Sequence, residues 1–365
     1  MRKFVALLLA AVMMVSMLAI ASAEDMQVAL ITDVGTITDQ SFNQTTYEAA
    51  KAYCDSNNVK FTYYQPATDT DADRIAMIDK AVDEGFNVIL MPGYKFGPAI
   101  GQVQEEYSDI KFIALDVSEG DLGGAALGSN VYCAVYQEEL CGYMAGYAAV
   151  KLGYKHLGFL GGMAVPAVIR YGYGFVQGVN AAAAELGIAG DVVVEYVYGN
   201  QFYGDADITA YMDNWYQNLG VEVVFACGGG IYTSAAEAAQ KVENGKVIGV
   251  DVDQAAIIDG AYGEGMTVTS AMKGLGATVN TLLSEIAADN FANYGGKVET
   301  LGLVGEDPAA NYVQIAPSTQ FSDAFTVEDY NALVAKMFAG EVTVSNAIDA
   351  EPAVEITVNY AGNVK

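Results

Sequence analysis

The sequence feature that most constrains the fold is a regular alternation of short apolar runs with amphipathic stretches. Four runs in the first third of the chain are apolar on both faces, as strands of a parallel sheet are: residues 28–31, 61–64, 88–91 and 112–115. Between two of them, Ile75, Ile78 and Val82 recur at helical spacing, and Gly85 follows as a helix stop. The alternation predicts a βα series, which builds a parallel sheet with right-handed crossovers.

The same alternation starts again after Asn130. It predicts helices at 137–151, from about 167 and at 207–218, and strands at 156–159, 192–197, 221–226 and 246–250. A chain of 365 residues also exceeds the usual size of a single hydrophobic core. We therefore predict an α/β fold with two similar lobes and a cleft between them, which the loops after the strand ends would face.

The last third of the chain continues the pattern less regularly. Strands are predicted at 267–270, 301–304 and 312–316, with a helix at 273–291. A further helix at 327–338 begins with a capping box formed by Thr326 and Asp329. Residues 354–360 alternate apolar and polar side chains at period two, which predicts a final edge strand.

The loop after the first predicted strand offers an unusual mixture of side chains. Ser41 and Gln44 have the spacing of a capping box, so the next helix is expected to begin at Ser41. Two carboxylates, Asp33 and Asp39, precede it, and Phe42 stands at the first helical position. We interpret Phe42 as a platform for a flat ligand; the alternative is that it packs beneath its own helix.

Residues 1–23 have the layout of a secretory signal peptide. Arg2 and Lys3 precede an apolar core, and Ala21-Ser22-Ala23 fits a cleavage site. The mature protein is therefore expected to be exported, to the periplasm or outside the cell. No cysteine follows Ala23, so an anchor through a lipidated N-terminal cysteine is not supported.

Charge narrows the class of ligand. The formal net charge of −28 repels phosphate backbones and argues against a nucleic-acid partner. Arginine is almost absent, with only Arg2, Arg74 and Arg170 in the chain. A pocket for a carboxylate or a phosphate normally uses a guanidinium group or a cluster of cations. We infer a neutral or cationic ligand.

Patterns for catalysis and for metal binding are weak. His156 is the only histidine and begins a predicted strand, so a nucleophile–histidine pair would depend on it alone, and we predict a structural role. The four cysteines lack a C-x-x-C pair, so neither a zinc site nor another cofactor is expected. Cys133 and Cys141 are the nearest candidates for a disulfide, and buried free thiols are the alternative.

Carboxylates follow several predicted strands, namely Asp33, Asp116, Asp251 and Asp253. Ionised carboxylates only accept hydrogen bonds, so they suit a ligand rich in hydroxyl and N–H donors. Together they predict a polyol-binding cleft, although each alone could be a loop or helix cap. Lys273 opens a predicted helix, where a cation opposes the macrodipole; a neighbouring Asp251 or Asp116 would explain it, and a solvated surface lysine is the alternative.

Residues 31–44 closely resemble the opening signature of the basic membrane protein family of ABC-transporter substrate-binding proteins, which includes a purine nucleoside receptor. Four further stretches resemble other landmarks of that family: Gly161-Gly162-Met163-x-x-Pro166, Gly174-Phe175-x-x-Gly178, Leu140-x-x-Tyr143-x-Ala145-Gly146 and Gly249-Val250-Asp251-x-Asp253-Gln254. The resemblance runs from about residue 29 to residue 316.

The resemblance implies a type I periplasmic-binding-protein fold. Two Rossmann-like lobes with parallel sheets would be joined by three crossovers and would close on the ligand like a hinged trap. The N-terminal lobe would comprise residues 26–130 plus 252–293. The C-terminal lobe would comprise residues 131–251 plus 294–365.

By motif, the resemblance also implies ligand contacts from Asp33, Phe42, Asn43, Asp116, Phe202, Gly228, Asp251 and Lys273. Phe42 would stack on a base together with an aromatic side chain of the other lobe, for which Phe202 is the best positional match and Tyr203 the alternative. Asn43 and Asp116 would face the base. Asp33, Asp251 and Lys273 would hold the ribose, and the glycines near Gly228 would let the backbone approach the ligand.

The hypothesis that follows is an exported, monomeric solute-binding protein that captures a purine nucleoside and delivers it to an ABC permease without performing chemistry. Riboflavin, another heterocycle or a sugar is the alternative ligand. A receptor component that reports to a membrane kinase or a chemoreceptor is an alternative of a different class. A nucleoside hydrolase, suggested by the cluster of aspartates, is a third.

Overall fold

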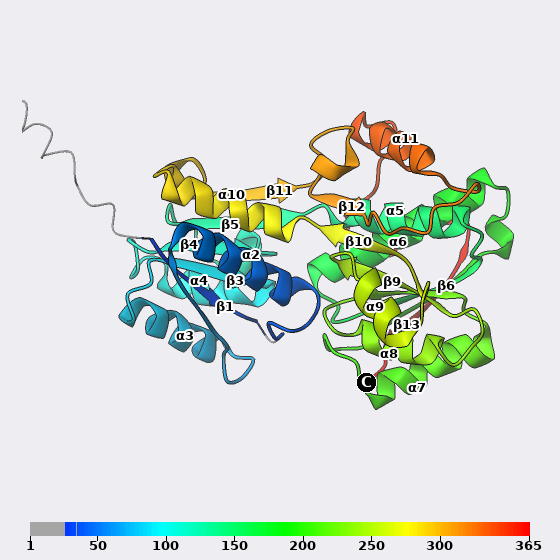
Figure 1. Ribbon diagram of the computed structural model, residues 1–365, viewed down its shortest axis with the longest axis horizontal. Coiled ribbons are helices and arrows are strands. Elements are labelled where there is room, and N and C mark those ends of the chain that lie inside the picture. Colours follow the sequence, from blue (N-terminus) through cyan, green and yellow to red (C-terminus); the bar gives the residue numbers. More distant parts are fainter. Residues whose placement is uncertain (1–25, 34) are drawn as a thin grey trace, which may run out of the picture.

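The computed structural model describes residues 26–33 and 35–365, which form two α/β lobes side by side (Figure 1). The predicted signal peptide, residues 1–23, lies outside the described residues. Each lobe is built on one sheet whose strands are parallel, except for one antiparallel pair in the second lobe. This confirms the predicted α/β class with parallel sheets.

The first lobe is built on a sheet with the strand order β11-β5-β4-β3-β1-β2. Its strands are β1 (Gln27–Ile31), β2 (Lys60–Tyr64), β3 (Val88–Pro92), β4 (Lys111–Leu115), β5 (Val131–Tyr136) and β11 (Lys297–Leu301). Its helices are α2 (Phe42–Asn57), α3 (Asp71–Asp83), α4 (Gly97–Val103) and α10 (Leu275–Ala287). Short 3-10 turns lie at Tyr94–Phe96, Glu119–Asp121 and Phe291–Asn293.

The second lobe is built on a sheet with the strand order β12-β10-β9-β8-β6-β7-β13. Its strands are β6 (His156–Gly161), β7 (Val193–Tyr198), β8 (Val223–Cys227), β9 (Lys246–Asp251), β10 (Thr267–Lys273), β12 (Val313–Ile315) and β13 (Thr357–Asn363). Its helices are α5 (Glu138–Lys151), α6 (Pro166–Glu185), α7 (Ala206–Asn214), α8 (Tyr232–Ala239), α9 (Ala255–Tyr262) and α11 (Val327–Phe338). Single turns lie at Ala189–Asp191, Trp215–Leu219 and Pro308–Ala310.

Strand β1 shows why its residues are apolar on both faces. Val28 and Leu30 pack in the core cluster that contains side chains of α2 and α10, whereas Ala29 and Ile31 pack in the cluster that contains side chains of α3 and α4. All four are fully buried, because successive strand residues point to opposite faces of a sheet that is covered on both sides.

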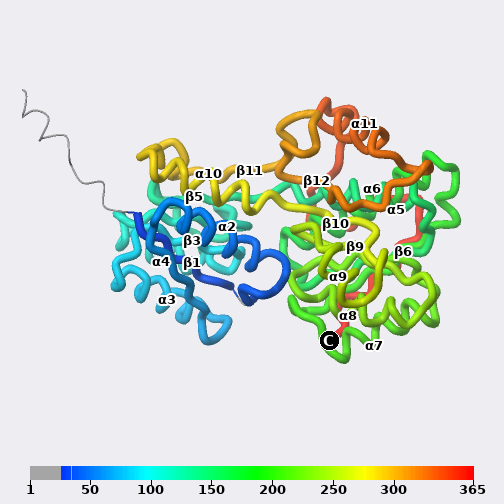
Figure 2. The backbone as a smooth tube through the Cα atoms, in the orientation of Figure 1, coloured from blue at the N-terminus to red at the C-terminus, as the bar shows by residue number. Residues whose placement is uncertain are grey.

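The chain crosses between the lobes three times, after β5, after β10 and after β11, and these connections run together between the two sheets (Figure 2). The first and third are hydrogen-bonded to one another, since the amide of Gln137 donates to the carbonyl of Leu301 at 2.9 Å. Crossover connections of this kind can act as a hinge between two lobes.

Sheet membership corrects the predicted lobe boundaries at three strands. Residues 131–136 and 297–301, which the prediction placed in the C-terminal lobe, pair within the first sheet as β5 and β11. Residues 267–273, which it placed in the N-terminal lobe, pair within the second sheet as β10. The predicted strand at 301–304 is likewise shifted, because the pairing with β5 covers 297–301.

Two further predictions can be compared with the structure. All four cysteines are buried free thiols, so the predicted alternative of a disulfide between Cys133 and Cys141 is wrong. The capping box at Thr326 and Asp329 is confirmed, with both of its hydrogen bonds present at the start of α11.

In the described part of the chain, no helix combines the length and apolar character that a membrane span requires.

Candidate functional site: a cleft between the lobes

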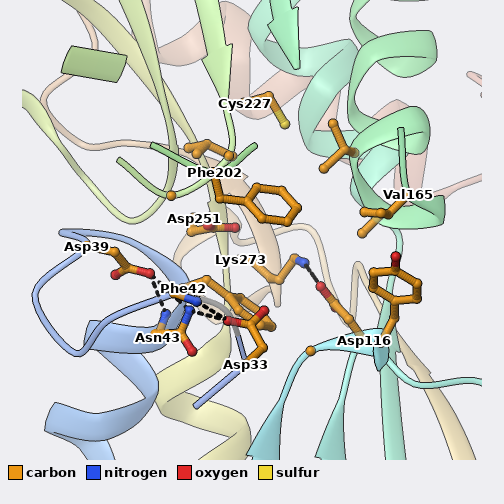
Figure 3. A pocket seen from close by; sticks show the side chains of 18 of the residues that line it. Asp33, Asp39, Phe42, Asn43, Asp116, Val165, Phe202, Cys227, Asp251 and Lys273 are labelled. Carbon is orange, nitrogen blue, oxygen red and sulfur yellow. Dashed lines mark hydrogen bonds and ion pairs between the residues drawn. The ribbon is translucent and has the colours of Figure 1, made fainter. Parts of the chain in front are cut away.

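The carboxyl ends of the two sheets face one another across a cleft of about 640 Å³. Parallel α/β sheets present their ligand sites at this edge. All eight residues to which the resemblance assigned ligand contacts line the cleft: Asp33, Phe42, Asn43, Asp116, Phe202, Gly228, Asp251 and Lys273. Figure 3 shows the labelled side chains converging on the space between the lobes.

Helix α2 begins differently from the prediction. Asp39 caps it, because its two carboxylate oxygens accept from the amides of Asn43 and Gln44, each at 3.0 Å. The predicted capping box is therefore wrong, since the Ser41 side chain makes no capping bond. Instead the Ser41 hydroxyl donates to Asp251 Oδ2 of the second lobe at 2.5 Å. With the cap supplied by Asp39, Ser41 is free to connect the lobes.

Asp33 is held in place by its own loop. Its Oδ1 accepts from the amide of Gly35 at 2.7 Å and from Asn43 Nδ2 at 3.0 Å. Burial raises the pKa of Asp33 to about 6, although these two hydrogen bonds oppose the rise. The Oδ1 atom of Asn43 is buried and has no hydrogen-bond partner among the described residues. The carboxylate of Asp33 is therefore fixed, whereas the buried amide oxygen of Asn43 has no partner among the described residues.

Lys273 joins the two lobes at the hinge. It is the last residue of β10 rather than the start of a helix, and its Nζ lies 3.0 and 2.8 Å from the two carboxylate oxygens of Asp116. The expected neighbour of Lys273 is thus confirmed as Asp116. The same Nζ lies 3.0 Å from Glu138 Oε1, and Arg170 Nε donates to the other oxygen of Glu138 at 2.6 Å.

The charged groups of this cluster shift one another's pKa values. Burial raises the pKa of Asp116 to about 6, although Lys273 opposes the rise. Burial alone would lower the pKa of the Lys273 ammonium, but Asp116 and Glu138 raise it above its ordinary value, so Lys273 stays charged. Burial favours the neutral form of Glu138, yet Lys273 and Arg170 hold its pKa below the usual range. Lys273 also faces aromatic rings, with Nζ 5.1 Å from the ring centroids of Phe42 and Tyr136.

Two of the cleft carboxylates stand on unusual backbone. Asp116 follows β4 with a φ angle of 60°, and Asp251 ends β9 with a φ angle of 65°, both in the left-handed region. Non-glycine residues there cost on the order of 1–3 kcal/mol, which indicates that the surroundings enforce the conformation. Asp253, the fourth carboxylate of the predicted polyol cleft, does not line it; its Oδ1 accepts from Ser318 Oγ at 2.5 Å.

Phe202 fits against the second lobe because two glycines leave room for its ring. A Cβ atom on Gly162 would lie 2.4 Å from Phe202 Cδ1, and one on Gly228 would lie 2.9 Å from the same atom. Gly228 also has a φ angle of 148°, which side chains rarely allow. In this structure, Gly228 thus makes room for the ring of Phe202. Tyr203, the alternative aromatic residue, is 62% exposed and lines an adjoining pocket together with Asp39 and Phe202, rather than the cleft itself.

Several lining residues were not predicted. The start of α6 contributes Ala167, Val168 and Tyr171, and Val165 immediately precedes this helix. Tyr94 follows β3, and Cys227 is the last residue of β8. The sequence contained a signal for part of this set, because the family-like stretch 161–166 leads directly into α6. Burial raises the pKa of the Cys227 thiol, so it stays protonated and adds to an apolar surface.

His156 lies away from the cleft, where its Nε2 is 3.1 Å from Glu195 Oε1. Among residues 26–33 and 35–365, no group of three or more histidine, cysteine or acidic side chains is arranged to hold a metal ion.

The comparison with known families agrees with this geometry. A family model described as "Bmp: ABC transporter substrate-binding protein PnrA-like" matches residues 26–344. The chain belongs to this family. Proteins of this class bind a small molecule outside the cytoplasm and serve a membrane permease, so the family is one of binding proteins rather than of enzymes.

Curated relatives are distant but cover most of the chain. The ABC transporter nucleoside-binding protein BmpA of Lactococcus lactis is 25% identical over 76% of this chain and 79% of its own length. The CD4+ T-cell-stimulating antigen of Listeria innocua is 27% identical over 76% of this chain and 78% of its own length.

Solved structures confirm the fold. An ABC transporter solute-binding protein from Aeropyrum pernix K1 matches with a TM-score of 0.68 at 19% identity, covering 88% of this chain and 87% of that chain. An ABC transporter solute-binding protein from Conexibacter woesei matches with a TM-score of 0.64 at 20% identity, covering 88% of this chain and 99% of that chain. The type I periplasmic-binding-protein fold implied by the sequence resemblance is thus supported by solute-binding proteins of known structure.

Proposed function

We propose that this protein binds a purine nucleoside between its lobes, as the substrate-binding component of an ABC importer. The observation that carries the proposal is the pairing of Phe42 and Phe202, which reach one cleft from opposite lobes, with carboxylates beside them. Two aromatic faces suit a flat heterocycle, and the carboxylates suit the hydroxyls of a sugar. The nucleoside-binding relative from Lactococcus lactis supports the same class of ligand.

The polar groups divide between base and sugar. The unoccupied Oδ1 of Asn43 can accept a hydrogen bond from an N–H of the base. Asp33 and Asp251 are acceptors suited to ribose hydroxyls, and Asp251 is already fixed by Ser41 from the opposite lobe. In this arrangement the base lies between Phe42 and Phe202.

The charge of the site favours a nucleoside over a nucleotide. Lys273 and Arg170, the cations of the hinge cluster, are both engaged by carboxylates. Lys95, close to the cleft residue Tyr94, forms an ion pair with Asp69. A phosphate would therefore meet Asp33, Asp39 and Asp251 without a free cation among these groups to bind it.

Transport follows from closure. Because the ligand would contact both lobes, it stabilises the closed arrangement and shifts the population toward the form that a permease recognises. The protein acts as an exported monomer in this proposal, delivers the ligand to the permease and performs no chemistry.

The experiment is a calorimetric titration of the mature protein, refolded to remove any carried ligand. Inosine, guanosine and adenosine are compared with free bases, ribose and riboflavin. We expect nucleosides to bind, and Phe42→Ala or Phe202→Ala to weaken binding by a factor of about 5 to 150, since a stacked base contributes roughly 1–3 kcal/mol.

Phe338→Ala is the matched control, because Phe338 lies on α11 and is 47% exposed. It should leave nucleoside affinity unchanged. Binding of ribose as tight as that of inosine would replace the proposal with a sugar-binding site. Selective binding of riboflavin would identify a flavin-binding protein. Release of free base from inosine would support the alternative that the protein is a nucleoside hydrolase.

A further inference from the structure

The last strand of the chain lies beyond the part that defines the family. The family model ends at residue 344, whereas β13 covers Thr357–Asn363 and adds a parallel edge strand beside β7. We propose that the end of β13, through Val364 and Lys365, positions the loop that carries Phe202. This inference rests on the proposed function, since it treats Phe202 as a ligand contact. Residues 199–205 are called the Phe202 loop below.

Strand β13 is attached along β7 by its own contacts. Thr357 to Tyr360 pair in register with Val193 to Tyr196, and the ring of Tyr360 lies 4.9 Å from that of Tyr196. Asn359 Nδ2 donates to Glu195 Oε1 at 2.9 Å. These contacts hold the strand on the sheet, but none of them reaches the Phe202 loop.

The contacts change character at the end of the strand. The amide of Val364 donates to the carbonyl of Tyr198 at 2.8 Å, and Tyr198 is the residue immediately before the Phe202 loop. Lys365 Nζ forms an ion pair with Asp205 Oδ2, and Asp205 is the last residue of that loop. Figure 1 shows the C end of the chain beside α7, which begins directly after the loop. The start of the loop is therefore tied through Tyr198 to Val364, and its end through Asp205 to Lys365.

Asp205 connects Lys365 to Gln201, the residue immediately before Phe202. Its Oδ1 caps α7 by accepting from the amides of Asp207 and Ile208, each at 3.0 Å. Its Oδ2, which meets Lys365, also accepts from Gln201 Nε2 at 2.9 Å. The cap and Lys365 hold the pKa of Asp205 at about 2, so the carboxylate is charged throughout the neutral range. A fixed Asp205 thus fixes Gln201.

The second lobe also holds the loop without β13. The amide of Gly230 donates to the Phe202 carbonyl at 2.9 Å, and the amide of Asn200 donates to the carbonyl of Gly162 at 2.9 Å. The loop should therefore keep its general course when the Lys365 contact is lost and gain mobility around Phe202. Lys365 and Asp205 are positioning residues in this scheme, and the expected effect on affinity is moderate.

The test compares Lys365→Gln with two controls in the full mature chain. Lys365→Arg keeps the charge, and Asn359→Ala removes a contact of β13 that does not reach the loop. We expect Lys365→Gln to weaken nucleoside binding by no more than about fivefold, because an exposed ion pair adds little to the stability of the loop that it fixes. Lys365→Arg should restore the affinity, and Asn359→Ala should leave it unchanged.

Amide hydrogen exchange of the ligand-free protein gives a readout that general destabilisation would not reproduce. Lys365→Gln should speed exchange in residues 199–205 and leave α2 of the other lobe unchanged. Unchanged exchange in the Phe202 loop, or equal loss of affinity in Asn359→Ala, would overturn the inference. This readout needs no ligand, so it tests the role of Lys365 even if nucleosides do not bind. A failure of nucleosides to bind would contradict only the proposed function.

Discussion

The two walls of the cleft are built from different chemistry. The first lobe contributes polar groups, with Asp33, Asp39 and Asn43 beside Phe42 and with Asp116 after β4. The second lobe contributes a largely apolar surface. Phe202 and Cys227 belong to it, as do four residues at the start of α6, namely Val165, Ala167, Val168 and Tyr171. Asp251 and Lys273 are the polar exceptions on this wall, and Ser41 of the first lobe binds Asp251.

This difference indicates how binding and closure are divided. Directional hydrogen bonds on the first wall would select the ligand and orient it, because an acceptor left unpaired in a buried site is costly. The apolar wall would contribute by removing surface from water, which is not directional and occurs only when the lobes close. The first lobe would thus select the ligand, and the second lobe would supply most of the favourable free energy when the lobes close.

Removing Lys273, a buried cation that contacts both lobes, should have the largest effect. Lys273→Met leaves the buried carboxylates of Asp116 and Glu138 without their ammonium, since Lys273 itself is only 5% exposed. Breaking a buried ion pair in this way costs roughly 3–5 kcal/mol. We expect a loss of that size in the free energy of unfolding, measured by urea denaturation.

Lys241→Met is the control for that loss. Lys241 pairs with Asp213 at 2.8 Å on the surface, where both side chains are partly exposed. Its removal should cost less than about 1 kcal/mol. Adding Asp116→Asn to Lys273→Met should recover part of the stability. Equal effects of the two lysine substitutions would show that the hinge cluster does not hold the lobes together.

The polar wall should also respond to pH, with a smaller effect. The pKa of Asp33 is about 6 in the folded protein against an ordinary 3.8, so the folded, ligand-free protein binds this proton more tightly than the unfolded chain. Its contribution to stability is therefore fully present below pH 3.8 and is lost as the pH rises through 6. A ligand hydroxyl instead needs the ionised carboxylate.

Stability and affinity should consequently change in opposite directions through Asp33. Between pH 7 and pH 5 the ionised fraction of Asp33 falls from about nine-tenths to about one-tenth, so nucleoside affinity should drop up to about tenfold. Calorimetry at pH 7, 6 and 5 measures this drop, and Asp33→Asn should flatten it. A wild-type profile that stays flat would place the ligand hydroxyls away from Asp33.

The sequence predicted the polar wall better than its surroundings. Asp33, Asp116 and Asp251 each follow an apolar strand, so a local rule places them at the cleft edge. The role of Ser41 depended on a residue 210 positions away, and Asp39 competed for the same helix amides. Local patterns also cannot show which sheet a strand joins, so β5, β10 and β11 were assigned to the wrong lobes.

The smallest predicted effect belongs to Tyr203, which lies next to Phe202 in sequence but outside the cleft lining. With 62% of its surface exposed, its ring has little area left to lose on ligand binding. Tyr203→Ala should therefore change nucleoside affinity less than about twofold, whereas Phe202→Ala should cost the stacking contribution of roughly 1–3 kcal/mol. Titrations of both variants with the same nucleoside measure the contrast. A larger loss in Tyr203→Ala would mean that Tyr203 turns inward to meet the base, and that the apolar wall rearranges when the ligand binds.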